Sequence, residues 1–328
     1  MANDGKRHGI VISSTGGTYT VRCDDGQTVD CRVKGNFRLR GIRSTSPVAV
    51  GDGVTVQSSA TAGAVPSGAE AVPSFITEID DRRNYIVRKA SNLSKQSHIL
   101  AANVDLALLV VTIKRPETST TFIDRFLASA EAYRVDTAIV LNKKDEWDDE
   151  ERTQADVLRA IYKDVGYEVF AISAQTGEGL DGLLAAMGGK VCLLAGNSGV
   201  GKSTLLNRLI PTAHARTAEI SEAHGTGMHT TTSSHLYDLP GAAGGAVIDV
   251  PGVKGFGTLN MEREEVSHYF RDIFRIAADC RFSNCTHTNE PGCAVLQALE
   301  DHRLAPTRYI SYQSILDDSE EGKYRGAP

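Results

Sequence analysis

The 328-residue sequence lacks any apolar run of about 18 residues, the length that a membrane-spanning helix requires. Its first ten residues, MANDGKRHGI, contain no apolar stretch of the secretory type, so we expect a cytoplasmic protein. Cysteine is scarce, with six in the chain, and a reducing compartment disfavours a disulfide framework. The net charge of −6 excludes a protein that is basic over its whole surface. A nucleic-acid partner would therefore need a local cluster of positive charge.

Residues 9–80 contain a series of short β-rich runs. These runs are IVI, YTVRC, VDCRVK, VAV and VTV, and turn signals such as Gly16-Gly17 separate them. Five short strands in a segment of this length predict a small barrel. Ser58–Ser74 is rich in alanine, serine, glycine and proline, and this composition predicts a mobile insertion.

One stretch of the predicted barrel, from Cys31 to Gly51, has no acidic residue. An ordinary solvated face would explain this pattern, and so would a surface that faces RNA. The positive side chains of this stretch are Arg32, Lys34, Arg38, Arg40 and Arg43.

Strand and helix patterns alternate from about residue 99 to residue 257. Val104–Thr112 is a continuous apolar run, as expected for a strand buried on both faces of a parallel sheet. The pattern predicts a doubly wound α/β domain, whose ligands bind at the carboxyl ends of the strands. The elements expected next are helix 119–134, strand 137–141, helix 149–163, strand 167–173, helix 178–187 and strand 190–195.

The segment GNSGVGKS at Gly196–Ser203 has the spacing of a phosphate loop. It follows an apolar strand pattern and precedes a helix pattern, which is the context that this loop requires. Its glycines let successive N–H groups point at the β-phosphate, whereas a glycine-rich turn with a surface lysine is the plainer alternative. We expect Lys202 to reach the β- and γ-phosphates and Ser203 to ligate Mg²⁺. The predicted nucleotide-binding residues here are Gly196, Asn197, Ser198, Gly199, Val200, Gly201, Lys202, Ser203 and Thr204.

The motif NKKD, with the SA dipeptide at the end of the next strand, predicts recognition of guanine. Asp145 can accept hydrogen bonds from guanine N1–H and the 2-amino group, and adenine offers neither donor there. We expect Asn142 to tie this loop to the phosphate loop, the Lys143 stem to lie along the base plane, and the Ala174 N–H to contact guanine O6. A charged loop at a helix entry is the alternative for the motif alone. The predicted base-binding residues are Asn142, Lys143, Lys144, Asp145, Ser173 and Ala174.

A third motif, DVPG at Asp249–Gly252, follows the strand pattern AVI. We expect Asp249 to hold Mg²⁺ through water and the Gly252 N–H to sense the γ-phosphate. Val253 comes next, where many GTPases place a glutamine that orients the attacking water. Valine cannot hydrogen-bond that water, so we infer slow intrinsic hydrolysis that needs another polar group.

The segment GMHTTT at residues 227–232 supplies an internal candidate for that group. His229 could orient the water, although a lone loop histidine is usually a solvated residue. Of the threonines that follow, Thr231 is expected to complete the Mg²⁺ shell. The predicted catalytic set is His229, Thr231, Asp249 and Gly252, with Ser203 and Thr231 as magnesium ligands.

Three of the six cysteines cluster with a histidine near the C-terminus. Cys280, Cys285, His287 and Cys293 form a Cys₃His set, which is typical of a closed structural zinc site. Free cysteines beside a surface histidine are the alternative. Met261–Ala278 and Cys293–Leu304 are expected to be helices around this cluster, and the tail after Asp317 is predicted to be disordered.

The order of the motifs differs from that of ordinary G proteins, in which the phosphate loop comes first. Here NKKD and SA precede GNSGVGKS, GMHTTT and DVPG, and CRFSNCTHTNEPGC follows them. In this order the chain resembles the circularly permuted GTPases of the ribosome small-subunit-dependent GTPase A family over nearly all of its length. The resemblance implies a multidomain protein with an OB-fold-like RNA-binding β-barrel at 1–80, a circularly permuted α/β P-loop GTPase domain at 81–258 and a mostly helical zinc-binding domain at 259–328.

The same resemblance implies an activity and partners. It implies GTP hydrolysis that the small ribosomal subunit stimulates in its own late maturation, with binding to rRNA and to GTP or GDP. It also implies one structural zinc ion, Mg²⁺ bound with GTP, no membrane partner and a monomer, and it adds weight to His229 in hydrolysis. The alternative is a nucleotide-gated binding module for another RNA or for the large subunit, with incidental hydrolysis.

Overall fold

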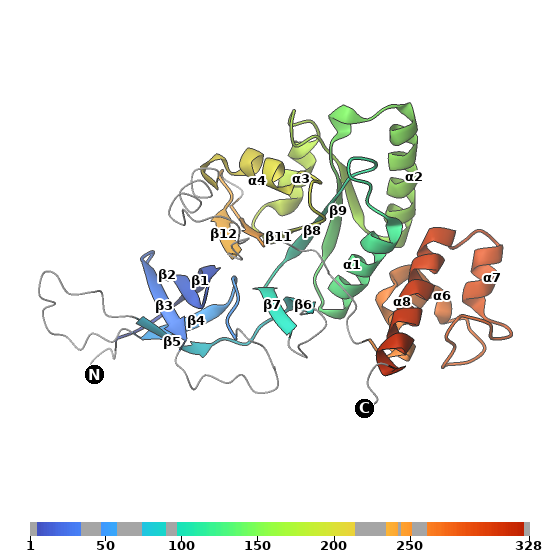
Figure 1. Cartoon of the computed structure of the whole chain (residues 1–328), viewed down its shortest axis with the longest axis horizontal. Coiled ribbons are helices and arrows are strands. Elements are labelled where there is room, and N and C mark those ends of the chain that lie inside the picture. Colours follow the sequence, from blue (N-terminus) through green and yellow to red (C-terminus); the bar gives the residue numbers. More distant parts are fainter. Residues whose placement is uncertain are drawn as a thin grey trace, which may run out of the picture. The chain divides into compact units, whose positions relative to one another are not determined.

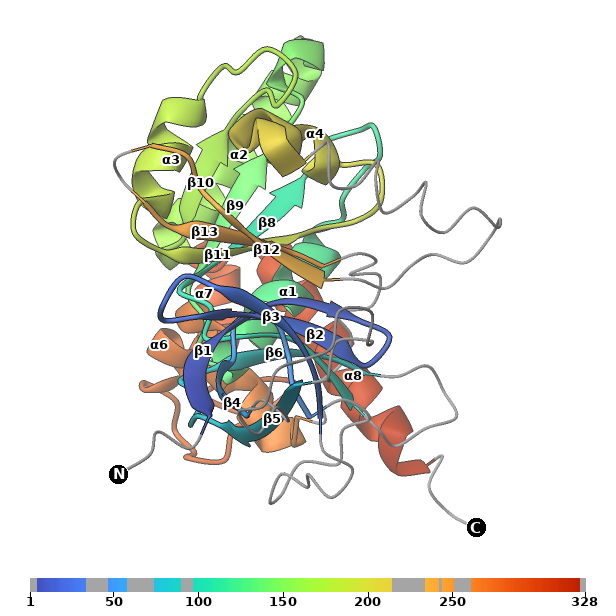
Figure 2. The ribbon, with the colours of Figure 1, turned by 90° about the vertical axis from the view of Figure 1, so that its left-hand side faces the viewer.

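The computed structural model describes residues 5–33, 47–57, 74–89, 97–213, 234–241, 244–250 and 261–324. The chain, drawn as a ribbon in Figure 1 and Figure 2, divides into two compact units. Each unit has a hydrophobic core of its own. The first unit comprises residues 1–105, 187–194 and 209–253, and the second comprises residues 106–186, 195–208 and 254–328. Among the described residues, each helix is too short or too polar to cross a membrane.

A closed five-stranded barrel forms much of the first unit. Its strands are β1 (Lys6–Thr15), β2 (Thr18–Cys23), β3 (Thr28–Val33), β4 (Gly53–Gln57) and β5 (Ser74–Ile79). They follow the order β1-β2-β3-β5-β4, and a further pairing of β1 with β4 closes the barrel. Inward-facing residues such as Val21, Val54 and Ile76 are fully buried, because alternate residues of a strand face the core. The predicted barrel is therefore confirmed, with the five strands of an OB-like fold.

One of the strands expected for this barrel is wrong. The run VAV at residues 48–50 makes only an isolated bridge from Val50, and β5 is the fifth barrel strand instead. Asp52 explains the difference, because its carboxylate accepts the Ala49 N–H at 2.8 Å and folds the run into a turn. Arg82 pairs with the same buried carboxylate at 2.7 Å and fixes that turn.

Several sequence features of the barrel lie outside the described residues. These include the expected insertion, apart from Ser74, which begins β5. Of the five positive residues in the acid-free stretch, only Arg32 is described, and it is exposed on β3.

Outside the barrel, the described residues of the first unit include five further strands. β6 (Tyr85–Lys89) and β7 (Ser97–Ala102) form a hairpin that the sequence did not predict. β13 (Ala246–Asp249) pairs in parallel with β11 (Val191–Ala195) and antiparallel with β12 (Ser234–Asp238). β12 also pairs with β1 of the barrel, where Ser13 lies opposite His235.

The second unit contains the predicted alternation of strand and helix. Strands β8 (Leu106–Val111), β9 (Thr137–Leu141) and β10 (Glu168–Ala171) are parallel, in the order β10-β9-β8. Every residue of β8 and β9 is buried, which confirms the expectation of strands covered on both faces. The helices are α1 (Thr120–Ala132), α2 (Asp149–Val165), α3 (Leu180–Met187) and α4 (Lys202–Leu209). Each predicted element of this segment is present to within a few residues.

Local caps explain where the two longest of these helices begin and end. The Ser119 side chain accepts the Phe122 N–H at the start of α1. Asp148 and Glu151 form a reciprocal capping box at the start of α2, and Gly166 ends that helix in a left-handed conformation. The side chains of Ser119, Asp148 and Glu151 therefore satisfy backbone N–H groups at the two helix starts that would otherwise be unpaired.

The C-terminal region of the second unit is helical, as expected, but one helix is broken. Met261–Ala278 is not continuous: η2 (Arg263–Tyr269) is a 3₁₀ helix, and α6 (Arg271–Ala277) follows it. Phe270 between them has extended backbone angles, φ −112 and ψ 99, and is fully buried against Tyr312. The extended backbone at Phe270 places its ring in the core and interrupts the helix.

The other helices here are α7 (Ala294–Glu300) and α8 (Pro306–Tyr324). The predicted disorder after Asp317 is wrong as far as Tyr324, because α8 continues through that segment. Arg125 of α1 forms an ion pair with Asp318 and donates to Ser314 Oγ at 2.8 Å, which holds this part of α8.

Candidate nucleotide site and metal cluster

The predicted phosphate loop connects β11 to α4, and its glycines have backbone angles that other residues rarely adopt. Gly196, Gly199 and Gly201 have φ values of 139, 83 and 94. A Cβ atom at Gly196 would lie 2.2 Å from the Val110 carbonyl oxygen, and one at Gly201 would lie 2.3 Å from Asn142 Nδ2. Only glycine fits at these two positions. The loop leads directly into the N-terminus of α4, where backbone N–H groups favour an anion.

Lys202 crosses back over the loop from the first residue of α4. Its ammonium donates to the carbonyl oxygens of Gly196 at 2.8 Å and Asn197 at 2.6 Å. Ser203 and Thr204 come next and are exposed. The lysine charge and the hydroxyl groups therefore lie together at the start of the helix, as a phosphate site requires.

Asn142 joins three loops of the second unit. Its side chain is buried, and Nδ2 donates to the Val200 carbonyl oxygen of the phosphate loop at 2.8 Å. Oδ1 accepts the Ala174 N–H at 2.9 Å. One amide thus connects the NKKD loop to both the phosphate loop and the SA loop, which includes the tie that the sequence predicts.

The contact expected for the Ala174 N–H differs in the structure. We expected this group to meet guanine O6, but it donates to Asn142 Oδ1. The cause is the orientation of the Asn142 amide. Its Nδ2 donates to the phosphate loop, so its Oδ1 faces the loop that follows β10. Ser173 shapes the same turn, because its Oγ accepts the Thr176 N–H at 3.0 Å.

The three loops surround a cavity of about 500 Å³, which lies within the range of small-molecule sites. Asp145 is exposed at this cavity, where its carboxylate can accept hydrogen bonds from a bound base. Lys143 has a left-handed backbone, φ 64, and also lines the cavity, whereas Lys144 pairs with Glu178 at 2.5 Å. The lining residues are Asn142, Lys143, Asp145, Glu146, Ala174, Gln175, Ser198, Gly199, Gly201, Lys202, Ser203 and Thr204.

The predicted switch residues are only partly described. Asp249 lies at the end of β13, opposite Leu194 of β11, and Leu194 lies two residues before Gly196, where the phosphate loop begins. His229, Thr231, Gly252 and Val253 lie outside the described residues.

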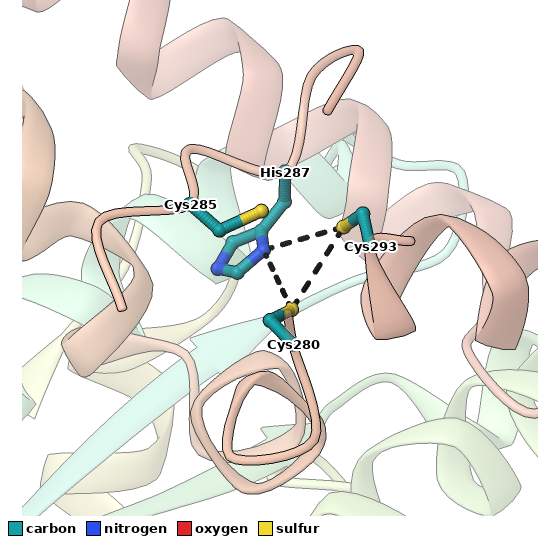
Figure 3. A group of neighbouring side chains, drawn as sticks. All are labelled: Cys280, Cys285, His287 and Cys293. Atoms are coloured by element: carbon teal, nitrogen blue, oxygen red, sulfur yellow. Dashed lines mark hydrogen bonds between the residues drawn. The ribbon is translucent and has the colours of Figure 1, made fainter. Parts of the chain in front are cut away.

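The four predicted metal ligands are close together in the C-terminal region (Figure 3). Cys280 Sγ lies 3.6 Å from His287 Nδ1 and 4.0 Å from Cys293 Sγ, and Cys293 Sγ lies 3.5 Å from His287 Nδ1. All four ligand atoms, including that of Cys285, lie within 4.8 Å of one another. A tetrahedral zinc ion separates two sulfur ligands by about 3.8 Å and sulfur from nitrogen by about 3.6 Å. The donor set and its spacing therefore fit a closed tetrahedral site.

Hydrogen bonds from α8 and within the loop hold this cluster in shape. Tyr309 Oη donates to the His287 carbonyl oxygen at 2.8 Å, and Tyr312 Oη donates to that of Thr286 at 2.9 Å. Burial opposes ionisation of Glu290, but hydrogen bonds led by those from Thr286 outweigh it and hold its pKa at about 2. Burial also raises the pKa of the Cys285 thiol to about 12, so a dication is what would favour its thiolate form.

A buried ion cluster that the sequence did not predict joins the C-terminal region to α1. The Arg308 guanidinium of α8 donates to Asp272 at 2.9 and 2.7 Å and to Asp124 of α1 at 2.6 Å. Tyr162 Oη donates to the same Asp124 oxygen at 2.9 Å. Arg308 and Asp124 are at most 1% exposed. An arginine in a polar helix normally indicates a solvated face, so the sequence offered no signal.

Two protein families match this chain. The RsgA GTPase family matches residues 79–259, and the RsgA N-terminal domain family matches residues 8–65. The small ribosomal subunit biogenesis GTPase RsgA of Bacteroides fragilis is 56% identical, over 97% of this chain and 99% of its own length. The protein of the same name from Porphyromonas gingivalis is also 56% identical, over 97% of this chain and 98% of its own.

Two solved structures resemble the chain over most of its length. YjeQ from Thermotoga maritima matches with a TM-score of 0.72 and 33% identity, over 96% of this chain and 98% of that protein. YloQ, described as a circularly permuted GTPase, matches with a TM-score of 0.69 and 28% identity, over 98% of each chain. These matches agree with the permuted motif order.

Proposed function

The chain belongs to the RsgA GTPase family, and we propose that it hydrolyses GTP in the late maturation of the small ribosomal subunit, whose rRNA it binds and which activates it. One observation carries this proposal. The chain is 56% identical, over nearly its whole length, to a relative named for small-subunit biogenesis. The cavity between the NKKD, SA and phosphate loops supports it independently, because these loops supply groups for a base and for phosphates.

The described residues have distinct roles in the proposed reaction. The phosphate-loop N–H groups and Lys202 bind the β- and γ-phosphates and stabilise the charge that develops on them. Lys202 already points across the loop, where the Gly196 and Asn197 carbonyl oxygens hold its ammonium. Asp145 reads the edge of guanine, and Asn142 keeps the three loops in register.

We assign the cation and the attacking water to Ser203, Asp249 and the switch segments. Ser203 and Thr231 would ligate Mg²⁺, and Asp249 would hold it through water. The bound ion would neutralise negative charge on the phosphates. His229 would orient the water in place of a glutamine, and Gly252 would sense the γ-phosphate. Val253 cannot hydrogen-bond this water, so hydrolysis by the chain alone would be slow, and we propose that the subunit completes the site.

The remaining assignments concern domains and partners. We propose that residues 1–80 bind rRNA, that residues 81–258 form the GTPase domain, and that residues 259–328 carry one structural zinc ion. Cys280, Cys285, His287 and Cys293 would hold that zinc, since their spacing suits a tetrahedral ion. The protein would act as a cytoplasmic monomer without a membrane partner.

A comparison of GTP turnover with and without ribosomal subunits tests the proposed function. The purified chain should hydrolyse GTP slowly alone and much faster with isolated small subunits, whereas equal rates would refute activation. Preferential binding to large subunits with a GTP analogue would instead support a nucleotide-gated binding module. A pull-down with each subunit, in the GTP-analogue and GDP states, separates these outcomes.

A further inference from the structure

The segment between β8 and α1, residues 112–118, contacts both halves of the proposed nucleotide site. Its two ends are joined, because the Thr118 N–H donates to the Thr112 carbonyl oxygen at 3.1 Å and Thr118 Oγ1 accepts the Thr112 N–H at 3.2 Å. Pro116 lies against the phosphate loop, where a Cβ atom at Gly199 would be 3.5 Å from its ring. The segment belongs to none of the nucleotide-binding motifs in the sequence.

Arg115 anchors this segment to α2 through a buried carboxylate. Its Nη2 lies 3.2 Å from both carboxylate oxygens of Glu151 and donates to the Glu146 carbonyl oxygen at 2.8 Å. The Glu151 side chain is only 2% exposed, whereas that of Arg115 is 57% exposed. Among the described residues, Arg115 is the cation that forms an ion pair with Glu151. A buried carboxylate requires such a partner, so the pair fixes where the Arg115 backbone lies.

The Arg115 backbone in turn holds Lys143. The Lys143 ammonium donates to the Arg115 carbonyl oxygen at 2.6 Å, a short charge-assisted hydrogen bond. Lys143 itself lines the nucleotide cavity, and its φ of 64 sets the direction in which its stem leaves the backbone. The orientation of that stem therefore depends on the Lys143 backbone conformation at one end and on the Arg115 carbonyl oxygen at the other.

We propose that residues 112–118 support the guanosine pocket through Lys143 and the phosphate loop, and that the Arg115–Glu151 pair positions the Lys143 stem against the face of the base. This inference deepens the proposed function and rests on it, because it requires guanine in this cavity. Arg115 is a positioning residue, since its carbonyl oxygen acts through Lys143. Glu151 acts one step further away, through the Arg115 guanidinium.

Nucleotide affinity in single variants tests the proposal. Arg115→Gln should bind GDP about tenfold more weakly, because it removes the ion pair with Glu151 that anchors residue 115, whose backbone oxygen orients Lys143. Glu151→Gln should also weaken GDP binding, while glutamine at this position still suits the helix cap. Arg152→Gln is the matched control, because Arg152 pairs with Asp149 on the exposed surface of the same helix. The control should bind GDP as the wild type does.

A second background separates positioning from a structural role. In a Lys143→Met chain, Arg115→Gln should cause no further loss of GDP affinity, although thermal unfolding would still report any loss of stability. IDP lacks the 2-amino group that Asp145 reads. Because Arg115 is proposed to act on the face of the base and not on this group, Arg115→Gln should weaken the binding of GDP and IDP by the same factor. Unequal factors would place the effect on base-edge reading and would overturn the proposal.

Two further outcomes would also overturn it: wild-type GDP affinity in Arg115→Gln, or an equal loss in the Lys143→Met background. If the wild-type chain binds guanine nucleotides and Asp145→Asn shifts its preference to xanthine, the proposed base site stands whatever Arg115 does. If the wild-type chain does not bind guanine nucleotides and Asp145→Asn does not change its preference, the base site is refuted and this inference with it. The two failures are therefore distinguishable.

Discussion

At the residue scale, a few groups determine whether the three loops form one site. Asn142 uses both ends of its amide, on Val200 and on Ala174, so its loss would separate all three loops. Asp145 has a different role, because its exposed carboxylate faces the cavity and is available to a ligand. We therefore expect nucleotide affinity to depend on the buried amide of Asn142 and base selectivity to depend on the exposed carboxylate of Asp145.

We predict that Asp145→Asn changes the base that the chain prefers. Asparagine presents an N–H donor where aspartate has only acceptors, so it should reject the guanine 2-amino group and accept the xanthine 2-oxo group. The preference for GDP over XDP should fall by about 100-fold or more. Competition binding with the two nucleotides measures this ratio, and Asp149→Asn, on the exposed start of α2, is the control. An unchanged ratio would remove Asp145 from base recognition.

We predict that Gly201→Ala abolishes nucleotide binding. The added methyl group would lie 2.3 Å from Asn142 Nδ2 at a φ of 94, so the loop must shift and the amide must lose its bond to Val200. The backbone strain alone costs about 1–3 kcal/mol. GDP titration and urea unfolding measure the two effects. Gly182→Ala in α3 is the control, because the added Cβ atom would lie 3.9 Å from its nearest neighbour, the Phe170 ring, and alanine favours a helix. Wild-type GDP affinity in Gly201→Ala would contradict the tight packing described.

Most residues of the nucleotide cavity could be predicted from the sequence, because the phosphate loop and NKKD need particular residue types at fixed spacing. The partner of the Ala174 N–H could not, because it depends on how the Asn142 amide is oriented after folding. Arg115 escaped prediction for a similar reason. It acts through its backbone oxygen, and no residue type signals that contact.

At the element scale, helices were predictable where polar caps mark their ends and unpredictable where burial interrupts them. Asp148 and Glu151 mark the start of α2 in the sequence itself. Phe270 breaks the helix expected over Met261–Ala278, because its ring must enter a core that only the folded C-terminal region creates. The run VAV failed as a strand because the Asp52 carboxylate binds the Ala49 N–H, a local contact that competes with strand pairing.

The attachment of α8 to α1 should depend on Arg308. Arg308→Met would leave Asp124 and Asp272 buried without their cation, and we predict a loss of about 3–5 kcal/mol in the free energy of unfolding. Urea unfolding of the full chain measures this loss. Arg303→Met is the control, because its pair with Asp301 is exposed and is worth about 1 kcal/mol at most. Equal stabilities of the two variants would show that the buried cluster does not stabilise this joint.

At the scale of the whole molecule, the second unit contains the nucleotide cavity and the Cys₃His cluster as separate structures. The cavity is lined by residues of the NKKD, SA and phosphate loops, and no residue of the described C-terminal region lines it. The C-terminal region is joined to α1 by Arg308 and by the Arg271–Glu131 pair at 2.5 Å. Its own shape depends on the cluster loop, which Tyr309 and Tyr312 hold against α8.

Metal removal should therefore affect the two structures unequally. Chelation of zinc at neutral pH should lower amide-exchange protection in α7 and α8, because the loop would lose the ion that neutralises its thiolates. GDP affinity should change by no more than about twofold, since the cavity residues keep their hydrogen bonds to one another. Cys285→Ser should reproduce the effect of the chelator, whereas Cys23→Ala, in the barrel core, should retain the wild-type metal content. A tenfold loss of GDP affinity after chelation would mean that the cluster supports the nucleotide loops through α8 and α1. Unchanged amide-exchange protection in α8 would mean that the ion does not stabilise that region.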